Sequence, residues 1–209
     1  MTTIDKLKWR YATKKFEASK TLSEEKLNIL KEAFNLTATS FGLQTIKMLV
    51  IKDENIRKDL VQHAYGQNQV LEASHLLVLC IQDNIVEDDV DEHFDNVKDI
   101  RATPKTILEP FQKQLTQMMT KMSISERQQW STKQAYIALG NLMTVCAIEG
   151  IDSCPMEGFN PEAYDDLLGL KNENLKSVLL LPVGYRADDD MFAELKKVRK
   201  QLNESIIEM

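Results

Sequence analysis

The sequence is poor in the residues that mark specialised classes of protein. It contains three cysteines, seven glycines and five prolines in 209 residues. Cys80, Cys146 and Cys154 form no closely spaced pair, and an odd number cannot be bridged completely within one chain. Met1 to Arg10 lacks the apolar run of a signal peptide, and eighteen consecutive apolar residues occur nowhere. We therefore expect a reduced, cytoplasmic protein.

Several functional signatures are also missing. The formal net charge of -6 argues against broad binding to nucleic acids or anionic membranes, because both need a basic surface. His63, His75 and His93 have no partner at a metal-ligand spacing, so we expect no metal site. A P-loop, a nucleophile elbow and a dinucleotide-binding glycine motif are absent. Nothing in the sequence therefore specifies hydrolysis, phosphoryl transfer or metal chemistry.

The composition is that of an ordinary globular protein, with 43% hydrophobic and 28% charged residues. The length predicts one domain spanning residues 1–209. Residues 83–124 are expected to form a peripheral helical excursion or lid. This region starts with the acidic segment 83–99, contains Pro110, which should break or kink a helix, and continues into the methionine-rich segment 111–122.

Three short apolar runs predict buried strands at 48–51, 75–81 and 177–183. The last resembles a parallel strand, which needs cover on both faces. A helix is predicted to run from 125 to 148. Its apolar residues surround it instead of forming one stripe, so it should be buried on all sides. A second subunit would make that burial easier for a chain of this size.

Two loops and two basic stretches are the candidate functional segments. The loop 152–159 combines a proline and a glycine around a glutamate, which allows main-chain N–H groups to approach a flat ligand. The loop 37–44 is rich in hydroxyl groups, although such residues are also typical of plain turns. The basic stretches 6–15 and 196–200 lie near opposite ends of the sequence. Each segment taken singly is also compatible with an ordinary turn or a solvated surface.

Taken together, these segments resemble the nitroreductase family. The blocks that carry the resemblance are Arg10-Tyr11-Ala12-Thr13-Lys14, Thr39-Ser40 with Gln44, Glu72-Ala73-Ser74-His75, Pro155-Met156-Glu157-Gly158-Phe159 and Lys197-Val198-Arg199. The resemblance implies a homodimeric, FMN-dependent enzyme that oxidises NAD(P)H. It also implies an α+β fold with a central, mostly antiparallel sheet flanked by helices. The long buried helix would lie at the dimer interface, and the C-terminal segment would reach the partner subunit.

The resemblance also assigns roles to individual residues. It places Arg10, Lys197 and Arg199 at the phosphate of FMN, where guanidinium groups donate paired hydrogen bonds. Lys14 would lie near flavin N1 and O2. The full set of implied cofactor-binding residues is Arg10, Tyr11, Ala12, Lys14, Thr39, Ser40, Gly42, Gln67, Gln69, Pro155, Met156, Glu157, Gly158, Lys197 and Arg199. We expect Phe41, Phe111, Met118 and Met119 to form an adaptable wall for the substrate. No catalytic side chain is expected, because flavin N5 would accept the hydride.

Two positions depart from the family pattern. Gly42 stands where the family often has asparagine, so a side-chain amide contact to the flavin must be lost or replaced. Ala12 stands where serine is frequent, which removes a hydroxyl group from the neighbourhood of the phosphate or ribityl chain.

The expected function is a ping-pong exchange in which NAD(P)H is oxidised and a nitroaromatic, a quinone or a related electron-poor acceptor is reduced. Two alternatives remain open: another flavin reaction on the same fold, such as dehydrogenation or reductive dehalogenation, and a non-catalytic module that binds an anion. Nothing marks a pocket for a 2′-phosphate, so the sequence does not choose between NADH and NADPH. It does not identify the physiological acceptor either.

Overall fold

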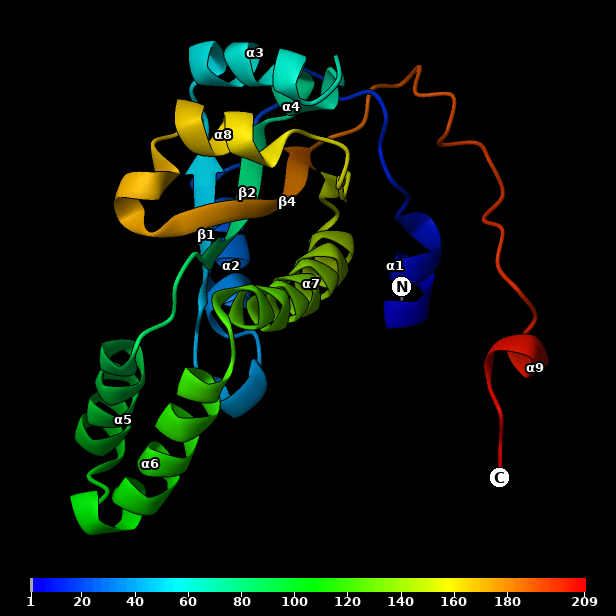
Figure 1. Cartoon of the computed structure of the whole chain (residues 1–209). Coiled ribbons are helices and arrows are strands. Elements are labelled where there is room, and N and C mark those ends of the chain that lie inside the picture. Colours follow the sequence, from blue (N-terminus) through cyan, green and yellow to red (C-terminus); the bar gives the residue numbers. More distant parts are fainter. Residues whose placement is uncertain (1) are drawn as a thin grey trace.

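A four-stranded antiparallel sheet lies at the centre of the molecule (Figure 1), in a computed structural model that describes residues 2–209. Its strands follow the order β1-β2-β4-β3, where β1 is Ile46–Ile51, β2 is His75–Gln82, β4 is Leu175–Gly184 and β3 is Asp152–Ser153. Each neighbouring pair runs antiparallel, so the parallel character expected for β4 is wrong. Apolar side chains fill β4 because helices cover both faces of the sheet, whichever way its neighbours run.

Alternate residues of β2 point into two separate cores, as the two-residue repeat of a strand requires. Leu76 and Val78 belong to one core, and Leu77 and Leu79 to the other; none of the four is accessible to solvent. The first core is covered by α3 (Glu54–His63), α4 (Gln69–Glu72), α8 (Pro161–Leu167) and η2 (Leu170–Glu173). The second is covered by α2 (Glu24–Asn35) and α7 (Ile124–Glu149).

The long helix α7 begins one residue before the predicted start and ends one residue after the predicted end. Ser123 caps it together with Glu126 in a reciprocal capping box, and Gly150 ends it with a positive φ of 66°. The prediction that it would be buried on all sides is wrong for the single chain. Tyr136, Ile137 and Ile148 are 44%, 50% and 46% exposed.

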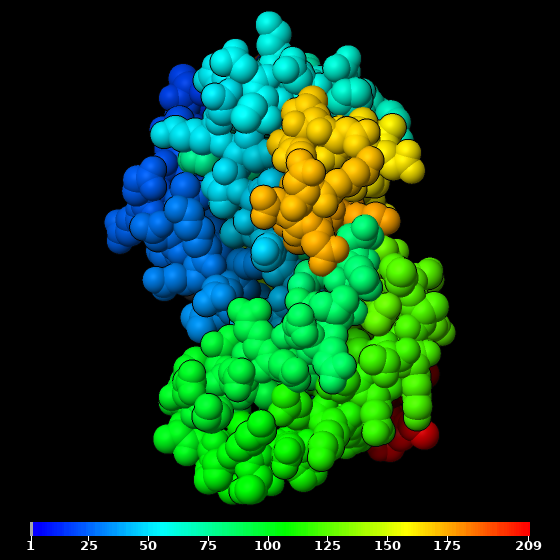
Figure 2. All heavy atoms as spheres, turned by 60° about the vertical axis from the view of Figure 1, so that its left-hand side comes forward, coloured from blue at the N-terminus to red at the C-terminus, as the bar shows by residue number. Residues whose placement is uncertain are grey.

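The helices α5 (Glu87–Arg101) and α6 (Lys105–Lys121) form a hairpin that projects from the sheet, and Figure 2 shows the same region as a separate green lobe. Its own small core contains Phe94, Leu115 and Met119. The helix break predicted at Pro110 does not occur, because α6 continues through this residue as one helix. Its position on an exposed face leaves the apolar side of the helix uninterrupted.

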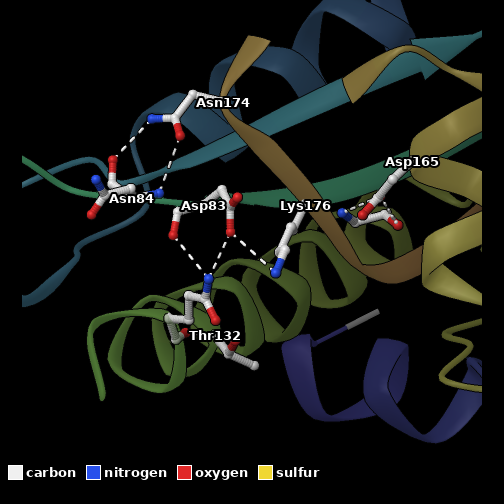
Figure 3. A network of polar contacts seen from close by, with 8 residues as sticks. Asp83, Asn84, Thr132, Asp165, Asn174 and Lys176 are labelled. Atoms are coloured by element: carbon white, nitrogen blue, oxygen red, sulfur yellow. Dashed lines mark hydrogen bonds and ion pairs between the residues drawn. The ribbon is translucent and has the colours of Figure 1, made fainter. Parts of the chain in front are cut away.

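A polar network fixes the point where the chain leaves β2 for this hairpin (Figure 3). The Asp83 carboxylate accepts a hydrogen bond of 2.6 Å from Gln128 on α7 and pairs at 3.1 Å with Lys176 on β4. The adjacent Asn84 exchanges two hydrogen bonds with Asn174, at 2.9 and 3.2 Å. The base of the hairpin is therefore tied to both α7 and β4.

Both ends of the chain lie on the same side of the body (Figure 1). After α1 (Thr3–Trp9), the chain forms a parallel bridge from Ala12 to Ser153 and an antiparallel bridge from Phe16 to Arg186. The segment after β4 has little regular structure before the short α9 (Leu202–Ser205). Within residues 2–209, no helix combines the length and the apolar character that crossing a membrane requires.

Candidate functional site

A cavity of about 450 Å³ lies where the N-terminal segment, the loop after β3 and the C-terminal segment meet. We call it the terminal cavity. Seven of the predicted site residues line it: Arg10, Tyr11, Ala12, Lys14, Pro155, Lys197 and Arg199. Lys196 is also part of its wall, whereas no aspartate or glutamate among residues 2–209 is. The two basic stretches, distant in sequence, therefore meet around one space.

The positive charge of the terminal cavity is not neutralised by the chain itself. Burial, followed by the neighbouring Arg199, lowers the pKa of Arg10. Burial, followed by Arg10 and Arg199, lowers the pKa of Lys197, whose Nζ donates hydrogen bonds to the carbonyl oxygens of Leu7 and Arg10. The Nε atom of Arg10 is buried without a hydrogen-bond partner. Crowded cations and an unused donor together favour an anionic ligand.

The N-terminal segment is held in place by a buried carboxylate. Asp190 accepts hydrogen bonds of 2.9 Å from the Tyr11 hydroxyl and 2.9 Å from the Lys14 main-chain N–H. The Thr13 N–H donates to the Ser153 carbonyl at 3.3 Å. Lys14 thus enters the cavity from a backbone that is fixed on both sides. Its Nζ lies 4.0 Å from the sulfur of Cys154, next to the predicted ligand-binding loop.

The loop that follows β3 is braced by groups from other elements. The Met156 N–H donates to the carbonyl of Leu180 at 2.9 Å, and the Met156 side chain packs in the core. The Tyr136 hydroxyl of α7 donates to the Glu157 carboxylate at 2.6 Å. These contacts fix the direction in which the loop leaves the sheet.

The two glutamines predicted to bind the cofactor, Gln67 and Gln69, are held within the protein instead of lining the terminal cavity. Gln67 donates its side-chain amide to the Gly158 carbonyl at 2.8 Å. A Cβ atom at position 158 would lie 3.2 Å from that amide, so a larger residue there would have to shift the Gln67 side chain. Gln69 is 7% exposed, so little of it faces solvent. Gln67 therefore stabilises the conformation of the loop that contains Gly158.

A second group of predicted residues gathers around η1 (Ser40–Gly42). The Ser40 N–H donates to the side-chain oxygen of Gln134 at 2.9 Å. The Phe41 ring lies 6.4 Å from that of Trp130 and 6.2 Å from that of Phe111. We call the predicted residues on this side the η1 cluster: Thr39, Ser40, Phe41, Gly42, Phe111, Met118 and Met119. Only Met119, which is 2% exposed, is enclosed in the hairpin core.

The η1 cluster and the terminal cavity lie apart within one chain. No residue of the cluster lines the cavity. Trp130, which contacts the cluster, and Met143, which lines the cavity, are thirteen residues apart on α7. At 1.5 Å per residue this separation is about 20 Å. The structure therefore gathers fourteen of the nineteen predicted site residues into two groups, and the other five, Gln67, Gln69, Met156, Glu157 and Gly158, belong to neither.

Sequence reasoning missed the residues that position the site. Asp190, Arg186 and Tyr136 hold the N-terminal segment or the loop, yet none was expected to have a role. Their partners lie between 21 and 179 positions away in sequence. No spacing pattern signals such contacts, because only the folded sheet brings them together.

The cations that line the terminal cavity fit the phosphate of FMN. The unpaired Arg10 Nε and the uncompensated cations of the terminal cavity provide the donors and the charge that a phosphate dianion requires. Among residues 2–209, no group of three or more histidine, cysteine, aspartate or glutamate side chains is arranged to hold a metal ion.

Comparisons with known proteins identify the family. Residues 7–185 match the model of the nitroreductase family. A protein of Staphylococcus aureus named as a candidate NAD(P)H nitroreductase is 32% identical, over 99% of this chain and 95% of its own length. A similarly named protein of Staphylococcus saprophyticus is 31% identical, over 99% and 96%.

Solved structures share the fold over the whole chain. A nitroreductase-like protein of Streptococcus mutans superposes with a TM-score of 0.85 at 22% identity, covering 99% of this chain and 97% of that one. A protein of Exiguobacterium sibiricum, solved in complex with FMN, gives a TM-score of 0.85 at 19% identity, covering 100% and 98%.

Proposed function

Because the chain belongs to the nitroreductase family, we propose that it is an FMN-dependent oxidoreductase that oxidises NAD(P)H. Its acceptors are nitroaromatics, quinones or related electron-poor compounds, reduced in a ping-pong exchange. The observation that carries the proposal is the terminal cavity, where both ends of the chain contribute cations and no aspartate or glutamate among residues 2–209 lines the wall. The names of the staphylococcal relatives and the FMN in the Exiguobacterium structure support it.

Three side chains hold the phosphate in this proposal. Arg10 and Arg199 donate guanidinium N–H groups, and Lys197 adds a third positive charge. Burial, followed by their mutual repulsion, lowers the pKa of Arg10 and of Lys197, and a dianion would offset that repulsion. Ligand binding therefore gains energy from a site that is electrostatically unfavourable without its ligand.

In this proposal Lys14 and the loop 155–158 would hold the ring system from its two edges. Bound FMN would supply the redox chemistry, the exchange of hydride between NAD(P)H and the acceptor. Lys14 would hold a positive charge beside the pyrimidine edge. The loop, braced by Tyr136 and Gln67, would offer the main-chain N–H groups of Glu157 and Gly158 to the opposite edge. No side chain needs to act as a general acid or base.

The complete site belongs to a homodimer in this proposal. The η1 cluster lies about 20 Å along α7 from the terminal cavity, so one chain does not close the site. A second copy that packs on α7 places its own η1 cluster over the ring. The half-exposed Ile137 and Ile148 lie on the same face of α7 and favour such a contact. The three unbridged cysteines favour the cytoplasm as its compartment.

The visible spectrum of the purified protein is the first test. We expect a yellow protein whose chromophore, released by heat, co-elutes with FMN and not with FAD or riboflavin. The holoprotein should then oxidise NADH when a quinone is supplied, with parallel lines in double-reciprocal plots. NADPH tested at equal concentration identifies the preferred donor.

Two outcomes would favour the alternatives. Bound FMN without turnover of either pyridine nucleotide would favour another flavin reaction on this fold. A colourless protein that does not take up FMN after incubation would favour a non-catalytic module that binds an anion.

A further inference from the structure

Arg186 is gripped by the two aromatic residues that flank Arg10. Its guanidinium carbon lies 4.4 Å from the centre of the Trp9 ring and 4.5 Å from the centre of the Tyr11 ring. Both contacts are within the range of a cation–π interaction. Arg186 does not line the terminal cavity, so it is not itself a ligand-binding residue.

Arg186 is in turn fixed to the sheet. Its Nε donates to one oxygen of Asp152 at 2.8 Å, and its main-chain N–H donates to the other oxygen at 2.9 Å. Asp152 lies in β3 and is 5% exposed, so this pair is shielded from solvent. An antiparallel bridge to Phe16 holds the Arg186 backbone as well. The Arg186 guanidinium is therefore held in a fixed position, and the rings of Trp9 and Tyr11 pack against it.

The contacts of Trp9 and Tyr11 with Arg186 constrain the direction of the Arg10 side chain. Arg10 has an extended backbone, with φ −69° and ψ 144°. Trp9, the last residue of α1, and Tyr11 both rest against Arg186, so the chain is held on both sides of Arg10. Held in this way, the Arg10 side chain lines the terminal cavity.

No carboxylate aims Arg10 instead. Its Nε is buried without a partner, and no salt bridge within residues 2–209 involves it. Its direction therefore comes from its neighbours' contacts with Arg186.

We propose that Arg186 is a positioning residue that aims Arg10 at the phosphate of the cofactor, and so sets the preference for a phosphorylated flavin. The proposal rests on the proposed function, because it requires FMN as the ligand. A positioning role and a general structural role predict different effects on the binding of the phosphate and of the ring. Loss of Arg186 should weaken recognition of the phosphate and leave recognition of the ring unchanged.

The test is to compare FMN with riboflavin, which has the same ring and no phosphate. Both dissociation constants are measured by fluorescence quenching with flavin-free wild-type protein and the Arg186→Met variant. Methionine keeps much of the length but loses the charge and the pair with Asp152. We expect FMN binding to weaken by about tenfold or more. Riboflavin binding should change by less than about twofold.

A double-mutant cycle with Arg10→Met isolates the link between the two arginines. If Arg186 acts through Arg10, the double variant should bind FMN no more weakly than Arg10→Met alone. Additive losses would overturn the proposal. Equal weakening of FMN and riboflavin by Arg186→Met would overturn it too, as would unchanged FMN binding.

Two further variants keep the result interpretable. Trp9→Leu removes one aromatic face while leaving the pair with Asp152, so it should cause the same selective loss even where Arg186→Met does not fold. Lys26→Met removes a comparable cation 5.5 Å from the Tyr185 ring, outside the terminal cavity, and should change neither affinity. If Arg10→Met leaves FMN binding intact, the proposed phosphate site itself is wrong. If Arg10→Met weakens FMN binding but Arg186→Met and Trp9→Leu do not, the phosphate site stands and the positioning role of Arg186 is wrong.

Discussion

A single carboxylate, that of Asp190, joins the two ends of the chain beside the terminal cavity. It is 3% exposed and accepts hydrogen bonds from the Tyr11 hydroxyl, the Lys14 N–H and the Phe192 N–H, at 2.9, 2.9 and 3.1 Å. Burial opposes its ionisation, but these hydrogen bonds outweigh burial and lower the pKa of the carboxyl. The ionised form of Asp190 is therefore the one that organises the site.

The Asp190→Asn variant should reveal this as a pH-dependent loss of stability. A lowered pKa stabilises the folded state fully above the unfolded value of about 3.9, and that gain is lost as the pH falls through the folded value. We expect Asp190→Asn to cost about 2–3 kcal/mol near neutral pH and progressively less below about pH 4. Urea unfolding at several pH values measures both quantities.

The neighbouring Asp188→Asn is the matched control, because Asp188 is an exposed aspartate of the same run. It should change stability by less than about 0.5 kcal/mol at every pH. A loss in Asp190→Asn that stays constant from pH 7 to pH 3 would contradict the role of the ionised carboxylate.

Lys14 offers a prediction on the electronics of the site. Its backbone is fixed by Asp190, and its side chain reaches the cavity wall beside Cys154. A positive charge near the pyrimidine edge favours a reduced, anionic ring, so Lys14→Glu should lower the reduction potential of bound FMN. We expect at least about 30 mV, or about 1.4 kcal/mol for a two-electron couple, by equilibration with reference dyes. The exposed Lys8→Glu is the control, and a potential that rises or stays constant in Lys14→Glu would remove Lys14 from the ring.

At the scale of residues, the sequence predicted which charged side chains form the site, but not the residues that position them. Arg10, Lys14 and Arg199 were identified by resemblance, and the structure places all three on one cavity. The sequence assigns no role to Asp190, because its contact with Lys14 spans 176 positions. Hydrogen bonds between distant segments follow from the strand order, which no local pattern contains.

Among the elements, the α5–α6 hairpin is the most independent. Its core, which includes Leu115, Phe94 and Met119, is separate from the two cores that flank the sheet, although Leu43 and Trp130 of the body also pack in it. Its base is tied to the body through Asp83 (Figure 3), by contacts that are in part exposed and so contribute modestly. The hairpin can therefore loosen while the sheet stays folded.

Leu115→Ala should loosen the hairpin selectively. Leu115 is 1% exposed, so its truncation should cost about 2–4 kcal/mol within the hairpin core. We expect faster hydrogen–deuterium exchange in residues 87–121 and unchanged exchange in β2 and β4. The same truncation at Leu79, which is 0% exposed in the sheet, is the control and should speed exchange throughout the molecule. Uniform faster exchange in Leu115→Ala would show that the hairpin is not a separate unit.

At the scale of elements, the sequence located the strands β1, β2 and β4 and the helix α7, but not how the strands pair. The apolar pattern placed α7 within one residue at each end. The direction of β4 was misjudged, because a strand covered on both faces is apolar throughout in either orientation. Pro110 was misjudged because a proline on an exposed face removes one hydrogen bond without disturbing the packed side.

The whole molecule leaves a large amount of apolar surface without cover. Ile137 and Ile148 on α7 and Ile4 on α1 are about half exposed, at 50%, 46% and 58%. Beyond β4, Leu195 and Val198 are 62% and 84% exposed. Single exposed apolar residues are common, but residues gathered on one helix face and on an adjoining extended segment are typical of an interface.

Ile137→Glu should therefore separate the proposed dimer. A charge at the centre of the α7 face would have to be buried in the interface, which is strongly unfavourable. We expect sedimentation velocity to show a monomer for the variant and a dimer for the wild type at the same concentration, together with loss of bound FMN. Ile107→Glu on α6, at a residue that is 66% exposed, should stay dimeric and yellow. A dimer that survives Ile137→Glu at low micromolar concentration would place the interface elsewhere.

The terminal cavity draws its walls from both ends of the sequence, and this fixes when the coenzyme can be captured during biosynthesis. Lys197 and Arg199 are translated after every strand of the sheet and after α7. A nascent chain that has synthesised β4 but not yet Lys197 and Arg199 therefore lacks these cations. The coenzyme can be captured only after every strand of the sheet has been synthesised, so a chain that stalls before Lys197 should not retain it.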